Sequence, residues 1–127
     1  MKTILIVEDD EKSRRLMKDV LMHKGYGVVT IATGDAALDM ALRHKPHLIL
    51  MDIQLPGISG VAALQELRFN DETRNIPVIA VTASVLDPDR ERIKQAGFDG
   101  FQTKPLNLPL FLQAVENMLA TGRAAQP

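Results

Sequence analysis

The sequence predicts an α/β fold, a parallel sheet with helices on both faces, on three observations. Short apolar runs recur along the chain, and three of the four clearest are continuously apolar, as strands buried on both faces of a parallel sheet are. Segments of helical period separate these runs, so strands and helices alternate. The length of 127 residues fits one domain.

The strands are expected at four apolar runs, followed by one weaker strand. The runs are Ile4–Val7, Val28–Ile31, Leu48–Met51 and Val78–Val81. A fifth strand near Phe98–Thr103 is weak by periodicity alone.

The first helix is expected from about Glu11 to His23, because its apolar residues fall on one helical face. Gly25 then supplies the stop signal. The second helix is expected over Asp35–Arg43, with Asp35 as its N-cap.

Three further helices complete the alternation. They are expected from near Ser59, from Asp87-Pro88 to Gly97, and from Pro109 onward. Five β-α repeats with short connections predict a doubly wound, flavodoxin-like sheet of five parallel strands in the order 2-1-3-4-5, with five helices. We assign residues 1–120 to this one domain and residues 121–127, which lack an apolar face, to a flexible tail or linker stub.

Composition excludes several classes of function. Fifteen Lys and Arg against sixteen Asp and Glu give a net charge of −1, without the basic surplus of a nucleic-acid binder. The absence of cysteine excludes disulfides, cysteine-ligated metals and a thiol nucleophile. The apolar runs are shorter than a membrane span, and the N-terminus turns acidic at Glu8, too soon for a secretory signal. We therefore expect a cytoplasmic protein that binds neither membrane nor nucleic acid directly.

Polar residues end the expected strands. Glu8 and Asp9 follow the first strand and Asp52 follows the third, while Thr82 and Lys104 follow the fourth and fifth. In open α/β sheets the ligand crevice lies at the carboxyl ends of the strands. In the expected strand order the first and third strands are neighbours, so the three carboxylates would share one small volume.

Such a cluster requires a compensating cation. Two carboxylates about 4 Å apart repel by roughly 4 kcal/mol at an effective dielectric of about 20, and Lys104 alone cannot neutralise three of them. Mg²⁺ prefers carboxylates, waters and phosphate oxygens as ligands. An Asp nucleophile, a hydroxyl donor and a Lys charge fit phosphoryl chemistry. The cluster therefore predicts a Mg²⁺ site.

Each of these residues also has an ordinary structural explanation when it is taken alone. An Asp at a strand end is commonly a helix N-cap, and an acidic first turn suits the helix dipole. A Lys before a Pro commonly belongs to a turn. The functional interpretation rests on the fact that these residues occur together, since every polar strand end falls on the same edge of the sheet.

Four separated motifs resemble those of the receiver domains of two-component response regulators. The motifs are Val7–Asp10, Leu50–Gly60, Val81–Ala83 and Thr103–Pro105. They follow the order and spacing of that family, and the resemblance covers Lys2 to Leu119. Single-domain cell-cycle regulators and the receivers of hybrid kinases are the most similar types.

The resemblance implies a phosphoryl-accepting signalling switch. Asp52 would take a phosphoryl group from a phosphohistidine on a sensor histidine kinase or a histidine phosphotransfer protein. Asp9 would ligate Mg²⁺ directly, Glu8 through water, and Gln54 through its backbone carbonyl.

The resemblance also implies a route from the site to the surface. Thr82 and Lys104 would contact the phosphoryl oxygens, and the bond from Lys104 to Pro105 is often cis in this family. Phe101 stands at the position of the aromatic switch residue, and the small Ala83 leaves it space to turn inward. Movement of Thr82 and Phe101 would shift the face made by the fourth helix, fifth strand and fifth helix, and so alter the affinity for a downstream protein effector.

Partners are expected on two surfaces. We expect the phosphodonor protein to dock on basic residues of the first helix and on the loop Pro105–Asn107, which flank Asp52. The basic residues are Lys12, Arg14, Arg15 and Lys18. A phosphorylation-dependent homodimer stays open, as does the choice between a stand-alone regulator and a receiver cut from a longer chain.

Two other classes of protein fit less well. Aspartyl-phosphate hydrolases carry a second Asp two residues after the nucleophile, where this chain has Gln54. A binding-only pseudo-receiver would be expected to lose one of Asp9, Asp52, Thr82 and Lys104, and all are present. We therefore expect a signalling module that catalyses only its own phosphorylation and dephosphorylation, not an enzyme.

Overall fold

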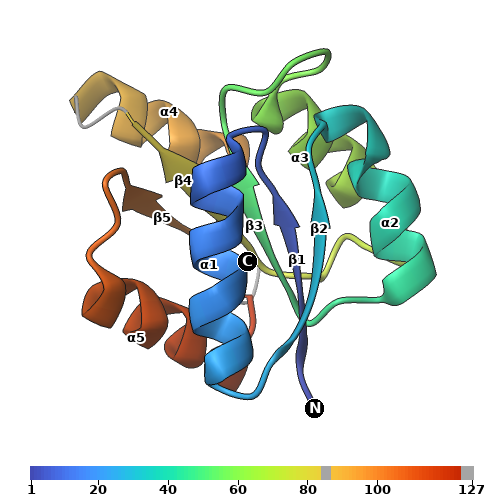
Figure 1. The fold of residues 1–127 in the computed structure, drawn as a ribbon. Helices are drawn as coiled ribbons and strands as arrows, with labels where there is room; N and C mark the ends of the chain where they lie inside the picture. Colours follow the sequence, from blue (N-terminus) through green and yellow to red (C-terminus); the bar gives the residue numbers. More distant parts are fainter. Residues whose placement is uncertain (84–86, 124–127) are drawn as a thin grey trace.

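A five-stranded parallel sheet forms the centre of the molecule, in the predicted order β2-β1-β3-β4-β5 (Figure 1). The computed structural model describes residues 1–83 and 87–123, with only the backbone for residues 87–90. The strands are β1 (Thr3–Val7), β2 (Gly27–Ile31), β3 (Leu48–Asp52), β4 (Val78–Thr82) and β5 (Gly100–Thr103). The predicted strand order is confirmed.

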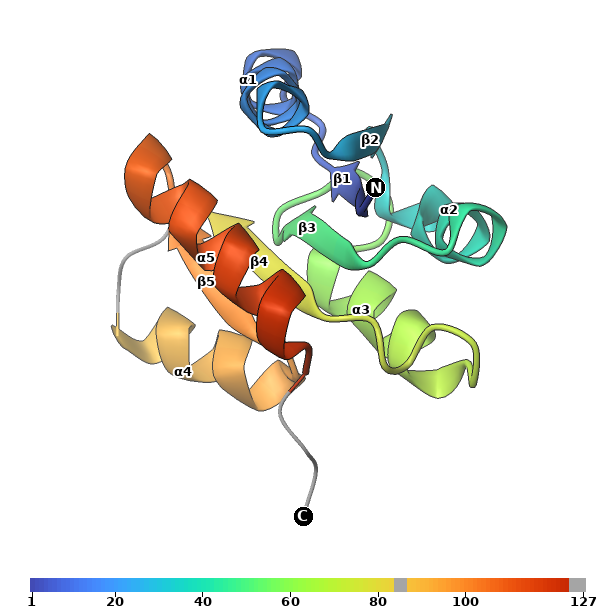
Figure 2. The ribbon, with the colours of Figure 1, turned by 90° about the horizontal axis from the view of Figure 1, so that it is seen from below.

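Helices cover both faces of the sheet, as the views in Figures 1 and 2 show. On one face lie α1 (Glu11–His23) and α5 (Leu108–Thr121). On the other lie α2 (Ala37–His44), α3 (Gly60–Phe69) and α4 (Asp87–Ala96). This arrangement is the doubly wound fold with five helices that the sequence predicts.

The sheet separates two apolar cores. Leu5 and Val7 of β1 pack with α2 and α3, while Ile4 and Ile6 pack with α1 and α5. Burial on both sides explains why the central strands are continuously apolar. The edge strand β5 is only partly buried, which explains its weak sequence pattern.

Side-chain caps begin three of the helices. The caps are Asp10 accepting from the Ser13 amide at 3.0 Å, Ser59 from the Ala62 amide at 3.1 Å, and Asn107 from the Leu110 amide at 3.1 Å. They precede α1, α3 and α5 respectively. Pro109, the predicted start of the last helix, lies one residue inside α5.

The predicted N-cap Asp35 is wrong. Asp35 lies inside a short 3-10 turn, η1 (Gly34–Ala36), and α2 begins after it without a side-chain cap. The cause is a tertiary contact, because Gly34 is buried against the loop after β3. A Cβ at Gly34 would come within 2.8 Å of the Ile58 carbonyl oxygen.

The last helix extends past residue 120, which is the predicted end of the domain. α5 runs to Thr121, and Arg123 Nε donates to Asp99 Oδ1 at 2.9 Å. Residues 121–123 of the predicted tail therefore lie against the fold, whereas residues 124–127 fall outside the described residues. Among the described helices, none has the length and apolar character needed to cross a membrane.

Candidate functional site

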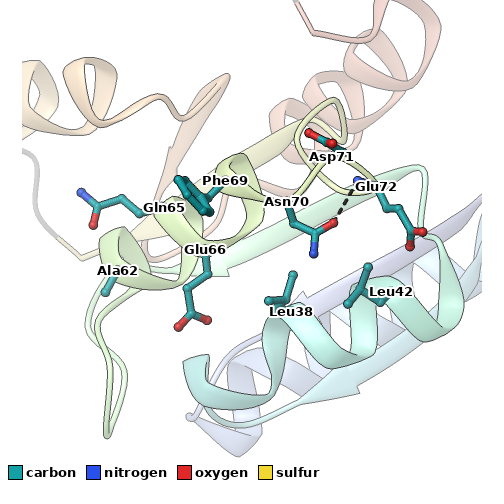
Figure 3. A pocket seen from close by; sticks show the side chains of 9 residues that line it. All are labelled: Leu38, Leu42, Ala62, Gln65, Glu66, Phe69, Asn70, Asp71 and Glu72. Atoms are coloured by element: carbon teal, nitrogen blue, oxygen red, sulfur yellow. Dashed lines mark hydrogen bonds between the residues drawn. The ribbon is translucent and has the colours of Figure 1, made fainter.

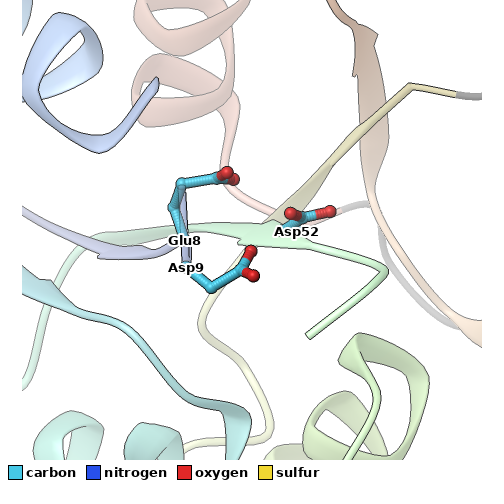
Figure 4. Close-up of side chains that lie close together, drawn as sticks. All are labelled: Glu8, Asp9 and Asp52. Carbon is cyan, nitrogen blue, oxygen red and sulfur yellow. The ribbon is translucent and has the colours of Figure 1, made fainter. Parts of the chain in front are cut away.

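The carboxyl ends of β1 and β3 bring three acidic side chains together (Figure 4). The strand register pairs Val7 with Met51, so the residues that follow β1 lie beside Asp52, the last residue of β3. One carboxylate oxygen from each of Glu8, Asp9 and Asp52 lies within 4.8 Å of the other two. The sheet thus assembles the acidic cluster at the edge where the sequence places it.

The cluster is buried on one side and open on the other. Glu8 is fully buried and Asp52 is 6% exposed, whereas Asp9 faces solvent. A cation or a phosphodonor therefore has access to the cluster from the side of Asp9.

Lys104 follows β5 and reaches the buried side of the cluster. Its Nζ donates to Glu8 Oε1 at 2.7 Å and to Asp52 Oδ2 at 3.3 Å. Partial burial alone would lower the pKa of Lys104, but the hydrogen bond to Glu8 and the charge of Asp52 outweigh burial and raise the pKa above its ordinary value. Lys104 is therefore a fixed positive charge beside Asp52. The Lys104–Pro105 peptide bond is cis.

Glu8 lies in surroundings that destabilise its ionised form. Burial is the main cause that raises the pKa of Glu8 to about 7; the hydrogen bond from Lys104 opposes this rise, and the charge of Asp52 adds to it. Glu8 Oε2 is buried and has no hydrogen-bond partner among the described residues. Because an unpaired buried acceptor is costly, this oxygen points to a missing positive partner.

The donor set fits Mg²⁺. When all three carboxylates are ionised, they and the one ammonium group leave two net negative charges, which a divalent cation balances. Mg²⁺ takes oxygen ligands and keeps several waters, and the solvent-facing Asp9 gives those waters access. Among the side chains that the structure describes, residues 1–83 and 91–123, no other group of three acidic or histidine residues converges in this way.

The loop between β3 and α3 holds the carboxylate of Asp52. The Gln54 amide donates to Asp52 Oδ1 at 3.1 Å, so both Asp52 oxygens are engaged, the second by Lys104. Gly60 approaches the Asp52 carbonyl so closely that a Cβ would collide with it. The role of the Gln54 carbonyl as a Mg²⁺ ligand stays a prediction.

Arg14 supports the site, although the sequence places it among the docking residues. Its Nη1 donates to the carbonyl oxygens of Glu8 at 2.9 Å and Asp9 at 3.5 Å. The guanidinium group thereby fixes the backbone that carries two of the three acidic side chains. The position of Arg14, one helical turn after the N-cap Asp10, is the sequence signal that could have found this contact.

The predicted switch residues lie on the neighbouring strands. Thr82 ends β4, is 4% exposed, and its carbonyl accepts the Lys104 amide at 2.8 Å. Phe101 of β5 is half-buried and lines a cavity of about 290 Å³ between α4 and β5. Ala83 is exposed at the end of the described segment after β4.

Comparisons with known proteins show which proteins this chain is similar to. A family model described as the response regulator receiver domain matches residues 4–116. The polar-differentiation response regulator DivK of Brucella anthropi is 43% identical over 118 residues, which span 93% of this chain and 96% of DivK. The receiver domain of a sensor histidine kinase from Pseudomonas aeruginosa PAO1, solved with a magnesium ion in its active site cleft, has a TM-score of 0.88 and 32% identity, covering 94% of this chain and 98% of that one. The chemotaxis response regulator CheY4 of Vibrio cholerae has a TM-score of 0.86 and 25% identity, covering 92% and 98%.

Proposed function

The chain belongs to the family of response regulator receiver domains, and on that premise we propose that Asp52 accepts a phosphoryl group from a phosphohistidine. Receiver domains of two-component systems are signalling switches rather than enzymes that act on external metabolites. One observation carries the proposal. The nearly buried Asp52 carboxylate is held between the Gln54 amide and Lys104, within a cluster that fits Mg²⁺.

The reaction needs a nucleophile and charge stabilisation at the phosphoryl oxygens. An oxygen of Asp52 bonds to phosphorus while the P–N bond of the phosphohistidine breaks, and the imidazole nitrogen leaves with the electron pair. Asp9, Asp52 and Glu8 would hold Mg²⁺, which would supply Lewis-acid stabilisation of the phosphoryl oxygens. Lys104 adds a fixed positive charge, and Thr82 offers a hydroxyl donor.

The signal then passes to the face formed by α4, β5 and α5. An acyl phosphate on Asp52 adds roughly one negative charge and three acceptor oxygens. The Thr82 hydroxyl moves toward these oxygens and vacates volume that Phe101 fills. Movement of the Phe101 ring would alter this face, because Phe101 lines the cavity between α4 and β5. The altered face changes the affinity for a protein effector or for a second phosphorylated copy of the chain.

The phosphodonor protein docks on α1 and on the loop Pro105–Asn107, beside Asp52. The exposed cations of α1 on this surface are Lys12, Arg15 and Lys18. Arg14 is half-buried and donates to the Glu8 carbonyl oxygen, so the docking test below uses Arg15. The ion pair of Arg15 with Glu11 at 3.3 Å is solvent-exposed and hence weak, so it does not withhold Arg15 from a partner.

Docking is tested by comparing two phosphodonors. Arg15→Glu should slow phosphotransfer from a histidine phosphotransfer protein by about tenfold, because a repulsive charge weakens association. Phosphorylation by acetyl phosphate, which needs no docking surface, should be unchanged. Lys94→Glu on α4 is the charge-matched control. Equal loss with both donors, or equal loss in the control, would contradict the assigned surface.

The acceptor residue is tested by mapping the modification. The chain is incubated with acetyl phosphate and Mg²⁺, the acyl phosphate is reduced with borohydride, and the peptides are sequenced by mass spectrometry. We expect reduction at Asp52 alone, and none in the isosteric Asp52→Asn variant. Modification at Asp9, or an unmodified folded chain, would overturn the assignment.

A further inference from the structure

A groove between α2 and α3 lies apart from the phosphorylation site and from both surfaces assigned above. Its volume is about 1040 Å³. Figure 3 shows Leu38 and Leu42 of α2 on one side of the groove and Glu66 of α3 on the other. We propose that this groove binds a basic segment of a partner protein that inserts apolar side chains between α2 and α3.

The first observation is exposed apolar surface. Phe69, at the end of α3, lines the groove and is 93% exposed. Leu38 and Leu42 are half-buried and present the rest of their surface to the same space. An exposed aromatic side chain and two partly exposed leucines that line one groove offer a partner apolar contacts, and Phe is among the residues enriched at protein interfaces.

The second observation is the charge of the lining. Glu66, Asp71 and Glu72 line the groove, and no Lys, Arg or His is among the lining residues. Asp71 forms an exposed ion pair with Arg74 at 3.3 Å. Glu66 and Glu72 form no ion pair within the described part of the chain. The groove therefore presents uncompensated negative charge around an apolar floor.

This charge pattern selects the occupant. A Lys- or Arg-rich segment complements the carboxylates, whereas the phosphates of nucleic acid or of a lipid surface would be repelled. A symmetric dimer through this face would bring two copies of the same acidic rim together. α2 and α3 also cover the face of the sheet opposite α1 and α5, so this site and the phosphodonor site can be occupied at the same time.

The test uses two defined helical peptides and the full chain labelled with ¹⁵N. One peptide places Lys on one face and Leu on the other, and the second has Glu in place of every Lys. We expect the Lys peptide to shift amide resonances of α2 and α3, and the Glu peptide to leave them unchanged. The variant Phe69→Ser should lower the affinity for the Lys peptide by about tenfold. The double variant Glu66→Lys with Glu72→Lys should lower it by a similar factor.

Matched controls lie on α5. Leu110→Ser removes another exposed apolar side chain, 57% exposed, and Glu116→Lys reverses another exposed charge. Neither should change binding. Resonance shifts centred on α1 or α5, equal binding of the Glu peptide, equal loss in the controls, or self-association through α2 and α3 without peptide would each overturn the proposal.

Discussion

Arg14 shows how a single side chain can set up the acidic site without joining it. Its guanidinium group bonds to the carbonyl oxygens of Glu8 and Asp9, so it holds the loop after β1 in place. It donates to carbonyl oxygens rather than to the acidic side chains, which leaves the carboxylates available to a cation. Arg14 is thus a positioning residue for two of the proposed metal ligands.

Arg14→Ala should weaken Mg²⁺ binding by about tenfold, the lower end of the loss seen when an outer partner of a metal ligand is removed. Isothermal titration with Mg²⁺ measures this affinity. Arg15→Ala, which removes only an exposed pair, should bind Mg²⁺ as the unmodified chain does. Unchanged affinity in Arg14→Ala would show that the loop holds its shape without the guanidinium group.

Lys104 illustrates the residue-level detail that a sequence does not contain. The order of strands predicts that Lys104 reaches the acidic cluster, and it does. Its shorter contact is to Glu8 at 2.7 Å rather than to Asp52 at 3.3 Å. This preference depends on side-chain lengths and rotamers at the end of β5, so the sequence pattern could not predict it.

At the scale of secondary-structure elements, Asp99 joins α3, β4 and β5 to the segment after α5, at the end of the sheet opposite the site. Its Oδ2 accepts from Arg68 Nη2 and from the Val78 amide, both at 2.8 Å, and its Oδ1 accepts from Arg123 at 2.9 Å. Burial is the main cause that lowers the pKa of Arg68; the charge of Arg123 adds to this and Asp99 opposes it. One carboxylate thus ties α3, β4, the start of β5 and the residues after α5.

Asp99→Ala should lower the free energy of unfolding by about 3 kcal/mol, because it leaves Arg68 charged and largely buried without its partner. Urea denaturation measures the change. Asp71→Ala, which breaks only the exposed pair with Arg74, should cost no more than about 0.5 kcal/mol. Similar losses in the two variants would mean that the hydrogen bonds of Asp99 contribute little to the free energy of unfolding.

The sequence predicts the elements well where a local signal exists. The bounds of α1 agree with the prediction, because its apolar face and the stop at Gly25 are local features. The start of α2 was missed, since the turn at Gly34 is shaped by contact with Ile58, which lies in a different loop. The acidic cluster could be predicted because strand ends meet at one edge, whereas the Asp99 contacts join segments far apart in the sequence and arise only on folding.

At the scale of the whole molecule, stability should depend on pH through Glu8. Its pKa is about 7 in the fold against 4.5 as the ordinary value, so between these values the folded chain holds a proton that the unfolded chain has lost. The free energy of unfolding without Mg²⁺ should therefore fall as pH rises from about 4.5 to beyond 7, by up to about 3 kcal/mol.

Urea titrations in EDTA at several pH values between 5 and 8 measure how the free energy of unfolding changes with pH. This range includes the pKa of Glu8, about 7. Glu8→Gln removes the titrating group and should flatten the curve. Saturating Mg²⁺ should also reduce the slope, because the cation favours the charged carboxylate. A slope that survives in Glu8→Gln would assign the pH dependence to other groups.

Mg²⁺-dependent phosphorylation of Asp52 is tested most directly by the intact mass of the chain after incubation with acetyl phosphate. We expect a gain of one phosphoryl group with Mg²⁺, no gain in EDTA, and none in Asp52→Ala. The same gain in Asp52→Ala or without metal would contradict the assignment of the acceptor or of the cation. No gain by a folded chain that binds Mg²⁺ would show that the site binds the metal without accepting a phosphoryl group.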